Sequence, residues 1–217
     1  MFSSRILRGL ALTLAALIGI SCGDYSRSTS PVSYNPKLLP PTLTVRAAYS
    51  TLSSGTKARA VRWGLEHSGL EQSVSAVIGP DGGTLSLPGS DFTMIIPSGA
   101  LDSDMTITVV AESGAYVSYQ MLPHGLKFIK PVTLVQDLRN TATYGTEEGN
   151  AIRTAYLPEG SDTIDADDSA SPSELQAATT YFYGAKPIAE TQVVSIRHFS
   201  RYILISGVWV CVSDCGR

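Results

Sequence analysis

The central part of the chain is a series of short segments in which apolar and polar residues alternate. Alternation is clear over 73–78, 92–96 and 105–112, and stretches rich in Gly, Pro or Asp separate these segments. A period of two places every second side chain on one face of a β-strand, so that this face can be buried. Short strands with turns about every 8–12 residues are typical of two packed sheets. The pattern therefore predicts an all-β fold, an antiparallel two-sheet β-sandwich.

Weaker segments complete the expected sheets. Strands are predicted at 84–87, 116–122, 131–136, 152–157, 181–183 and 192–205. One turn of helix is expected after the acidic loop 158–173. Ser171 can cap the helix, Pro172 can occupy its first position, and the Glu174 side chain can bond back to the capping residue. The prediction is thus a sheet structure with one short helical turn.

The N-terminus has the pattern of an export signal. Arg5 and Arg8 precede an apolar stretch, 9–20, that is too short to span a membrane and typical of the core of a signal peptide. Cys22 follows a small residue at the end of this stretch, as in bacterial lipoproteins. We expect residues 1–21 to be removed and Cys22 to be lipidated, which anchors the chain in the membrane of a bacterial cell envelope, periplasmic or surface-facing. The alternative is an ordinary secretory peptide that is cut nearby.

The expected domain organisation follows the composition along the chain. Residues 22–57 are rich in Ser, Thr, Pro and Tyr without an apolar period, which predicts a flexible tether. Residues 58–72 are ambiguous between a strand and a linker. The sandwich is expected over 73–206, with a C-terminal tail over 207–217.

Composition and cysteine usage narrow the function classes. Apolar residues make up 43% and charged residues 16% of the chain, so a packed core is expected. The formal charge of −3 and the lack of clustered Lys and Arg argue against a nucleic-acid partner. If Cys22 is lipidated, Cys211 and Cys215 remain, and an oxidising compartment favours a disulfide between them. Two free thiols are the alternative, and two thiolates alone are too few ligands for a metal.

Four motifs, taken together, carry a resemblance to a known family. They are Gly82-Gly83-Thr84-Leu85, Ile96-Pro97-Ser98-Gly99-Ala100-Leu101, Gly125-Leu126-Lys127-Phe128 followed by Pro131-Val132, and His198-Phe199-Ser200-Arg201-Tyr202. They resemble the ZU-five domain, a β-sandwich of zonula occludens proteins, netrin receptors and ankyrins. The resemblance spans roughly residues 73–206, and the 158–178 insertion departs from it. It implies a binding or scaffolding module, with a protein or glycan partner that the sequence leaves unknown.

The tripeptide His198-Phe199-Ser200 raises a second hypothesis, self-cleavage. Certain relatives cut their own chain between the Phe and the Ser of such a tripeptide. Ser200 Oγ would attack the Phe199 carbonyl, and His198 would take the proton. An unbent strand would put His198 and Ser200 on one face. The simpler interpretation is that Phe199 is a core residue and the tripeptide a fold signature, so no catalytic residue and no enzyme activity are expected.

The acidic loop suggests a third hypothesis, a calcium- or glycan-binding surface domain. Four aspartates lie at 162, 165, 167 and 168. In a calcium loop that starts at Asp165, Ala170 would stand where Gly is needed, and Gln176 where a bidentate Glu is needed. A solvated loop is therefore preferred, and no metal site or cofactor is expected.

Overall fold

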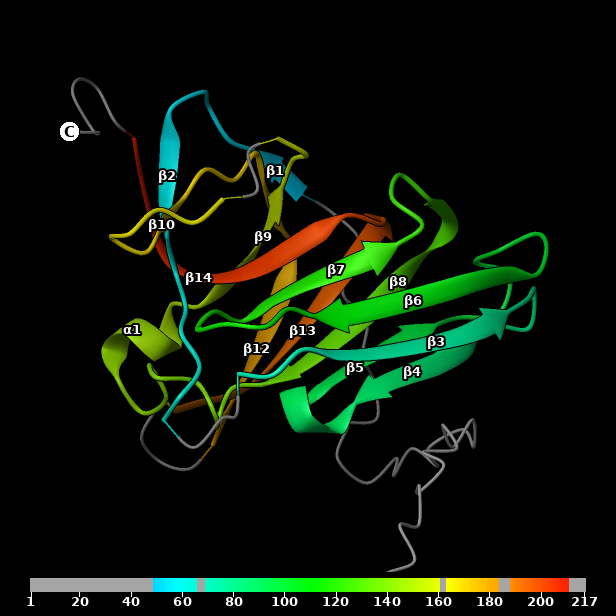
Figure 1. Ribbon diagram of the computed structural model, residues 1–217, viewed down its shortest axis with the longest axis horizontal. Coiled ribbons are helices and arrows are strands. Elements are labelled where there is room, and N and C mark those ends of the chain that lie inside the picture. The colour runs from blue at the N-terminus through cyan, green and yellow to red at the C-terminus, as the bar shows by residue number, and fades with distance from the viewer. Residues whose placement is uncertain (1–48, 66–68, 161–162, 184–187, 211–217) are drawn as a thin grey trace, which may run out of the picture. The chain divides into compact units, whose positions relative to one another are not determined.

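The computed structural model of the chain describes residues 49–65, 69–160, 163–183 and 188–210. Two antiparallel sheets face each other in it, so the predicted all-β sandwich is confirmed. Figure 1 shows strands β14, β7, β6 and β3 in front of the second sheet. Across the described ranges, no helix combines the length and the apolar character needed to cross a membrane.

The larger sheet has nine strands and the smaller one has five. The larger sheet contains β1 (Tyr49–Thr51), β2 (Thr56–Ala60), β3 (Gln72–Ile78), β6 (Met105–Ala111), β7 (Ser118–Leu122), β9 (Arg153–Leu157), β10 (Ser169–Ala170), β11 (Glu174–Gln176) and β14 (Arg201–Val210). The smaller sheet contains β4 (Gly83–Leu87), β5 (Phe92–Ile96), β8 (Lys127–Asp137), β12 (Ala178–Tyr183) and β13 (Ile188–His198). A 3-10 turn, η2 (Pro88–Ser90), and a short helix, α1 (Glu147–Asn150), lie in the connections.

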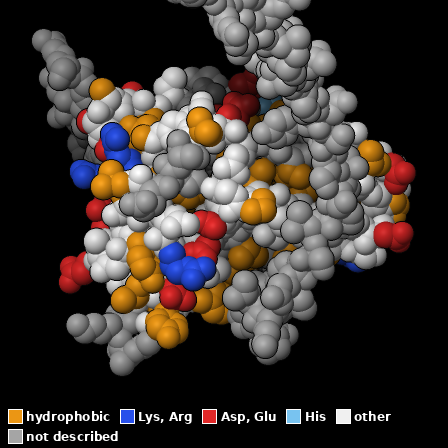
Figure 2. Space-filling model, turned by 60° about the horizontal axis from the view of Figure 1, so that its bottom comes forward, with side chains coloured by type: hydrophobic (Ala, Val, Ile, Leu, Met, Phe, Trp, Pro, Cys, Tyr) orange, Lys and Arg blue, Asp and Glu red, His pale blue; other side chains and the backbone are white. Residues whose placement is uncertain are grey.

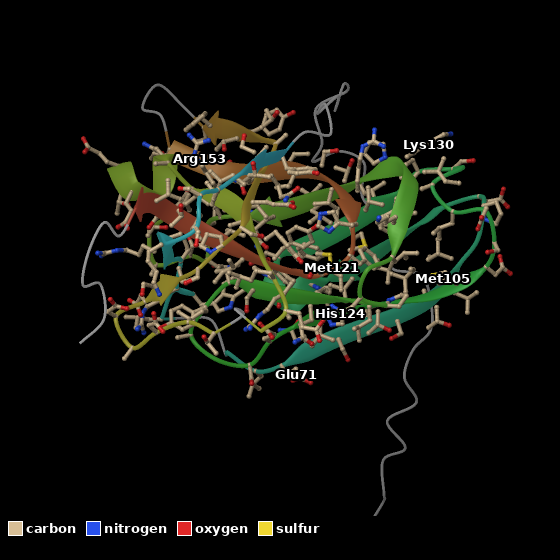
Figure 3. The ribbon with its side chains drawn as sticks, turned by 90° about the horizontal axis from the view of Figure 1, so that it is seen from above. Glu71, Met105, Met121, His124, Lys130 and Arg153 are labelled. Atoms are coloured by element: carbon tan, nitrogen blue, oxygen red, sulfur yellow. The ribbon has the colours of Figure 1, made fainter. Side chains whose placement is uncertain are left out.

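The strand order puts β14 in the middle of the larger sheet. That sheet runs β1-β11-β9-β14-β7-β6-β3, and β2 pairs with the second half of β14 and with β10. The smaller sheet runs β12-β13-β8-β5-β4. Figure 3 looks at the sandwich from above, with Arg153 of β9 and Lys130 of β8 toward opposite ends.

The main core lies between the sheets, and β14 contributes to a second one. In β5, Phe92, Met94 and Ile96 are buried and alternate with half-buried residues, as a strand with one covered face requires. From Tyr202 to Ile205 both faces of β14 are buried: Tyr202 and Leu204 join the main core, whereas Ile203 and Ile205 join a smaller cluster with residues of β2 and β10. β14 is therefore held by apolar contacts on both sides of its sheet.

Two buried glutamines join the sheets through polar contacts. Gln136 of β8 lies opposite Gln192 of β13 in the strand register. The Tyr119 hydroxyl of β7 donates to Gln136 Oε1 at 2.5 Å, and the Thr154 hydroxyl of β9 donates to Gln192 Oε1 at 2.6 Å. Buried polar groups are costly unless they are hydrogen-bonded, so these pairs favour one alignment of the two sheets over a sliding one.

The sandwich begins earlier and ends later in the chain than expected. β1 and the start of β2 lie within the expected tether 22–57, because β1 pairs with β11 and β2 pairs with β14. β14 continues to Val210, into the expected tail 207–217. Cys22, Cys211 and Cys215 lie outside the described residues, so their predicted lipidation and disulfide stay predictions.

The expected helical turn after Ser171 is wrong. Glu174–Gln176 forms β11, which pairs with both β1 and β9. Pairing on two sides outweighs the weak local preference for a capped turn. The helix lies instead at α1, where the Thr146 hydroxyl accepts a hydrogen bond from the Gly149 N–H at 3.0 Å.

Candidate functional site

The chain crosses from the smaller to the larger sheet at Phe199 and Ser200, which we call the inter-sheet corner. β13 ends at His198 and β14 begins at Arg201 (Figure 1). The single strand expected over 192–205 is therefore two strands. Their apolar pattern hides the break, since both flanking segments are buried and the crossover needs only two residues.

Backbone hydrogen bonds tie the inter-sheet corner to the loop between β7 and β8. The Gly125 N–H donates to the Phe199 carbonyl at 3.0 Å, and the Phe199 N–H donates to the Leu126 carbonyl at 2.8 Å. The buried Phe199 ring packs edge-on against Phe128, with the ring centroids 4.7 Å apart. Two of the motifs that carry the family resemblance thus meet as one packed unit.

The His198 imidazole points to partners other than Ser200. Its Nδ1 lies 3.3 Å from the Tyr202 hydroxyl, and its Nε2 lies 3.4 Å from Glu174 Oε2. The Tyr202 hydroxyl also donates to the His198 carbonyl at 2.7 Å. Burial, and then the Glu174 charge, raise the Tyr202 pKa above its usual value, so Tyr202 stays a neutral donor. In this arrangement neither ring nitrogen is placed to take a proton from Ser200.

A hollow of about 460 Å³ opens beside the inter-sheet corner, and we call it the corner hollow. Its lining includes Gln120, His124, Lys127, Tyr156, Glu159, Ser200 and Arg201. Strand pairing brings them together: Arg201 of β14 lies between Gln120 of β7 and Leu157 of β9, and His198 lies opposite Lys127 of β8. The volume is within the range of about 300–1,000 Å³ that is usual for small-ligand sites.

Most polar side chains of the corner hollow have no partner within residues 49–65, 69–160, 163–183 and 188–210. Lys127, Glu159 and His124 are exposed, and Gln120 and Ser200 are half-buried. Within the part of the chain that the structure describes, no hydrogen bond or ion pair engages these five side chains. They are therefore available to a ligand.

Arg201 is the exception in this lining. Its Nε donates to Glu112 Oε2 at 2.8 Å, and its NH2 group lies 2.6 Å from the same oxygen. The Ser118 hydroxyl also donates to Glu112. Arg201 is thus a fixed part of the wall, and its charge is compensated from outside the corner hollow.

Most residues of this lining were not predicted from the sequence. Gln120, Tyr156 and Glu159 lie near the ends of strands that are distant in sequence, and His124 is isolated in the β7–β8 loop. The polar residues that flank Gly125 and Ser200 in the sequence are the signal that could have indicated this site.

The other motif residues form a second corner, outside the corner hollow. Gly82 has φ +76°, and a Cβ there would lie 2.3 Å from a backbone oxygen at the end of β5. Gly83 begins β4, Pro97 follows β5, and Gly99 has φ +74°. Pro131 lies in β8. These residues shape turns and strands.

Cations and a hydroxyl group from other segments of the protein bind the aspartates of the acidic loop. Lys57 Nζ donates to Asp165 at 2.9 Å, and the Tyr116 hydroxyl and the Arg62 guanidinium both donate to Asp168. The hydrogen bond from Lys57 is the main cause that lowers the pKa of Asp165. The pKa of Asp168 is lowered mainly by the hydrogen bond from Arg62 and then by that from Tyr116.

Asp167 is hydrogen-bonded within the acidic loop itself. It accepts a hydrogen bond from the Ser169 hydroxyl at 2.7 Å, which lowers its pKa. Among the described residues, no group of three or more His, Cys, Asp or Glu side chains converges as metal ligands would. Asp162 lies outside the described residues.

Charged and apolar side chains are mixed on the face that Figure 2 shows. Hydrophobic side chains lie there among acidic and basic ones.

The sequence matches no protein-family model and no curated protein.

Proposed function

We propose that this chain is a binding module of the bacterial cell envelope, anchored through a lipid on Cys22, which holds its partner in the corner hollow. One observation carries the proposal: Lys127, Glu159, Gln120 and Ser200 line a concave site, and their side chains have no partner among the described residues. Sites that bind ligands combine a concavity with a few convergent polar groups.

The N-terminal pattern supports the envelope location. A signal-like apolar stretch ends at Cys22, and the Ser- and Pro-rich segment that follows suits a spacer between an anchor and a folded domain. The ZU-five resemblance, in which the sandwich is a binding and scaffolding module, agrees with this proposal.

Self-cleavage between Phe199 and Ser200 is a second candidate. The Gly125 N–H already donates to the Phe199 carbonyl oxygen, as a donor that stabilises a developing oxyanion would. The engagement of both His198 ring nitrogens by Tyr202 and Glu174 argues against it, since the Ser200 hydroxyl then lacks a base.

A binding test uses the mature chain with Cys22→Ser, so that no lipid holds it to membranes. The protein is mixed with sacculi and membrane vesicles from a bacterium that lacks it, and the sedimented fraction is measured. We expect the chain to sediment, and Lys127→Ala and Glu159→Gln each to lower its affinity about tenfold, as expected for lost hydrogen bonds to charged groups.

Lys130→Ala is the matched control. Lys130 is exposed on the same strand as Lys127, but its Nζ donates to the Ser98 carbonyl at 2.6 Å, and it does not line the corner hollow. Sedimentation that is insensitive to Lys127→Ala and Glu159→Gln would refute the proposed use of the corner hollow.

A mass measurement tests the anchor and separates the two candidates. The protein from its native envelope is analysed under denaturing conditions, reduced and unreduced. We expect one chain that starts at an acylated Cys22 and is two hydrogens lighter before reduction, through a Cys211–Cys215 disulfide. Two fragments that meet between Phe199 and Ser200, and disappear in Ser200→Ala, would establish self-cleavage instead.

A further inference from the structure

We infer that the ligand of the corner hollow is a saccharide, an uncharged molecule rich in hydroxyl groups. This inference rests on the proposed function, since it names the ligand class for the same site. It is argued from three properties of the lining: its hydrogen-bonding groups, its aromatic wall and its paired backbone.

The hydrogen-bonding groups of the corner hollow are mixed in kind. Lys127 can only donate and Glu159 can only accept, whereas Gln120 and Ser200 can do both. An anionic ligand would meet Glu159, and a cationic one would meet Lys127. A sugar presents several hydroxyl groups, each a donor and an acceptor, and so can satisfy all four side chains together.

The fixed charges of the lining cancel. Lys127 and Glu159 carry opposite charges, and Glu112 compensates Arg201 within an ion pair at 2.6 Å. The corner hollow therefore gives no electrostatic advantage to a strongly charged ligand over a neutral one.

Tyr156 supplies an aromatic surface in the wall. Its ring meets His198 edge-on, with centroids 5.2 Å apart, and lies 6.0 Å from the Tyr202 ring. Contacts with these two aromatic neighbours restrict the ring, so less conformational freedom is lost on binding. The C–H faces of a pyranose ring pack well against such a surface, while its hydroxyl groups reach the polar residues.

The backbone argues against an extended peptide as the ligand. Peptides that add to a sheet need unpaired N–H and C=O groups along an edge. Here the Gly125 N–H is bonded to the Phe199 carbonyl, and the Met121 N–H donates to the Ser200 carbonyl at 3.1 Å. The corner hollow thus offers mainly side chains, which suits a sugar.

The test is an NMR titration of the mature chain with Cys22→Ser, labelled with ¹⁵N. Chitotriose, maltotriose and the tripeptide Ala-Ala-Ala are the probes, added separately. We expect at least one trisaccharide to shift the amide signals of Gly125, Leu157 and Ser200. Lys127→Ala and Glu159→Gln should each weaken that binding about tenfold, and Lys130→Ala should leave it unchanged. Urea unfolding of each variant shows that its fold is intact.

The remaining outcomes overturn the inference in distinguishable ways. Shifts caused by the tripeptide alone would refute a saccharide ligand and leave a binding site in the corner hollow. No shift with any probe would refute the saccharide, and the proposed function would then stand or fall with the sedimentation of the Lys127→Ala and Glu159→Gln variants on envelope material.

Discussion

At the scale of single residues, a network of polar contacts is buried between the two sheets. Tyr119 stacks on Phe92, with ring centroids 4.2 Å apart, and its hydroxyl donates to Gln136. Gln136 in turn donates to the Ser90 carbonyl at 3.1 Å. Each member of such a network depends on the others, because an unpaired polar group in a core is costly.

Replacing Tyr119 by Phe should therefore destabilise the protein, although the ring is kept. The change leaves Gln136 Oε1 without its 2.5 Å donor, and we expect a loss of about 1–3 kcal/mol in the free energy of unfolding, measured in urea. Ser90→Ala is the control, since the buried Ser90 hydroxyl has no partner among the described residues and its removal should cost little. Equal effects of the two variants would contradict this account.

The buried tyrosines also predict a loss of stability in alkali. Burial is the main cause that raises the pKa of Tyr119 and of Tyr202 above the usual value. The folded state then keeps both protons while the unfolded chain releases them at about pH 10. Below that pH the two tyrosines make their full contribution to the free energy of unfolding. Above it this contribution falls by about 1.4 kcal/mol per pH unit for each tyrosine.

Urea midpoints between about pH 8 and about pH 11 measure this effect. The Tyr119→Phe variant should show a shallower decline above about pH 10, because only Tyr202 of this pair still resists ionisation. A decline of equal slope in both proteins would show that Tyr119 does not contribute.

At the scale of elements, a strand is predictable from sequence when it buries one face. β5 and β6 do so, and their alternation marks them almost to the residue. β1 is exposed along its whole length, and β14 is buried on both faces from Tyr202 to Ile205, so neither has a clear period of two. β11 is found only through its partners β1 and β9.

The corner hollow is harder to predict from the sequence, because its residues become neighbours only through strand pairing. Tyr156, Gln120 and Ser200 come from separate segments, and only the pairing of β14 with both β9 and β7 makes them neighbours. The tripeptide that contains Ser200 is recognisable in the sequence, but the bend that turns His198 toward Tyr202 and Glu174 is a property of the crossover between the sheets.

The turn before β4 offers a test of element geometry. Gly82→Ala places a Cβ at positive φ and 2.3 Å from the Ile96 carbonyl oxygen. Gly145→Ala is the matched control, because Gly145 has φ +79° and its Cβ would meet nothing within 4 Å. We expect Gly145→Ala to cost about 1 kcal/mol of unfolding free energy in urea, and Gly82→Ala to cost at least about 1 kcal/mol more. Similar losses would show that the turn relaxes easily.

At the scale of the whole molecule, β14 joins most parts of the fold. It pairs with β9, β7 and β2, supplies both apolar clusters, and carries Arg201 into the corner hollow. By contrast, β1 and β3 lie at the edges of this sheet, and each pairs with a single neighbour in it.

A chain that ends at Ser200 should therefore fail to fold. Without β14, the strands β9 and β7 lose their common partner, and Ile107 and Leu157 lose apolar cover. We expect collapsed amide dispersion in the NMR spectrum and no cooperative urea transition. A chain that ends at Val210 is the control and should unfold cooperatively. A folded chain ending at Ser200 would show that β14 is dispensable.

The place of β14 also bears on how the protein is made. It is the last described strand along the chain but sits in the middle of its sheet. During synthesis, which proceeds from the N-terminus, neither apolar cluster can close before residues 201–210 have emerged. Secretory channels accept chains that have not yet folded. If the chain is exported as proposed, a late central strand would leave both apolar clusters incomplete until residues 201–210 have been made.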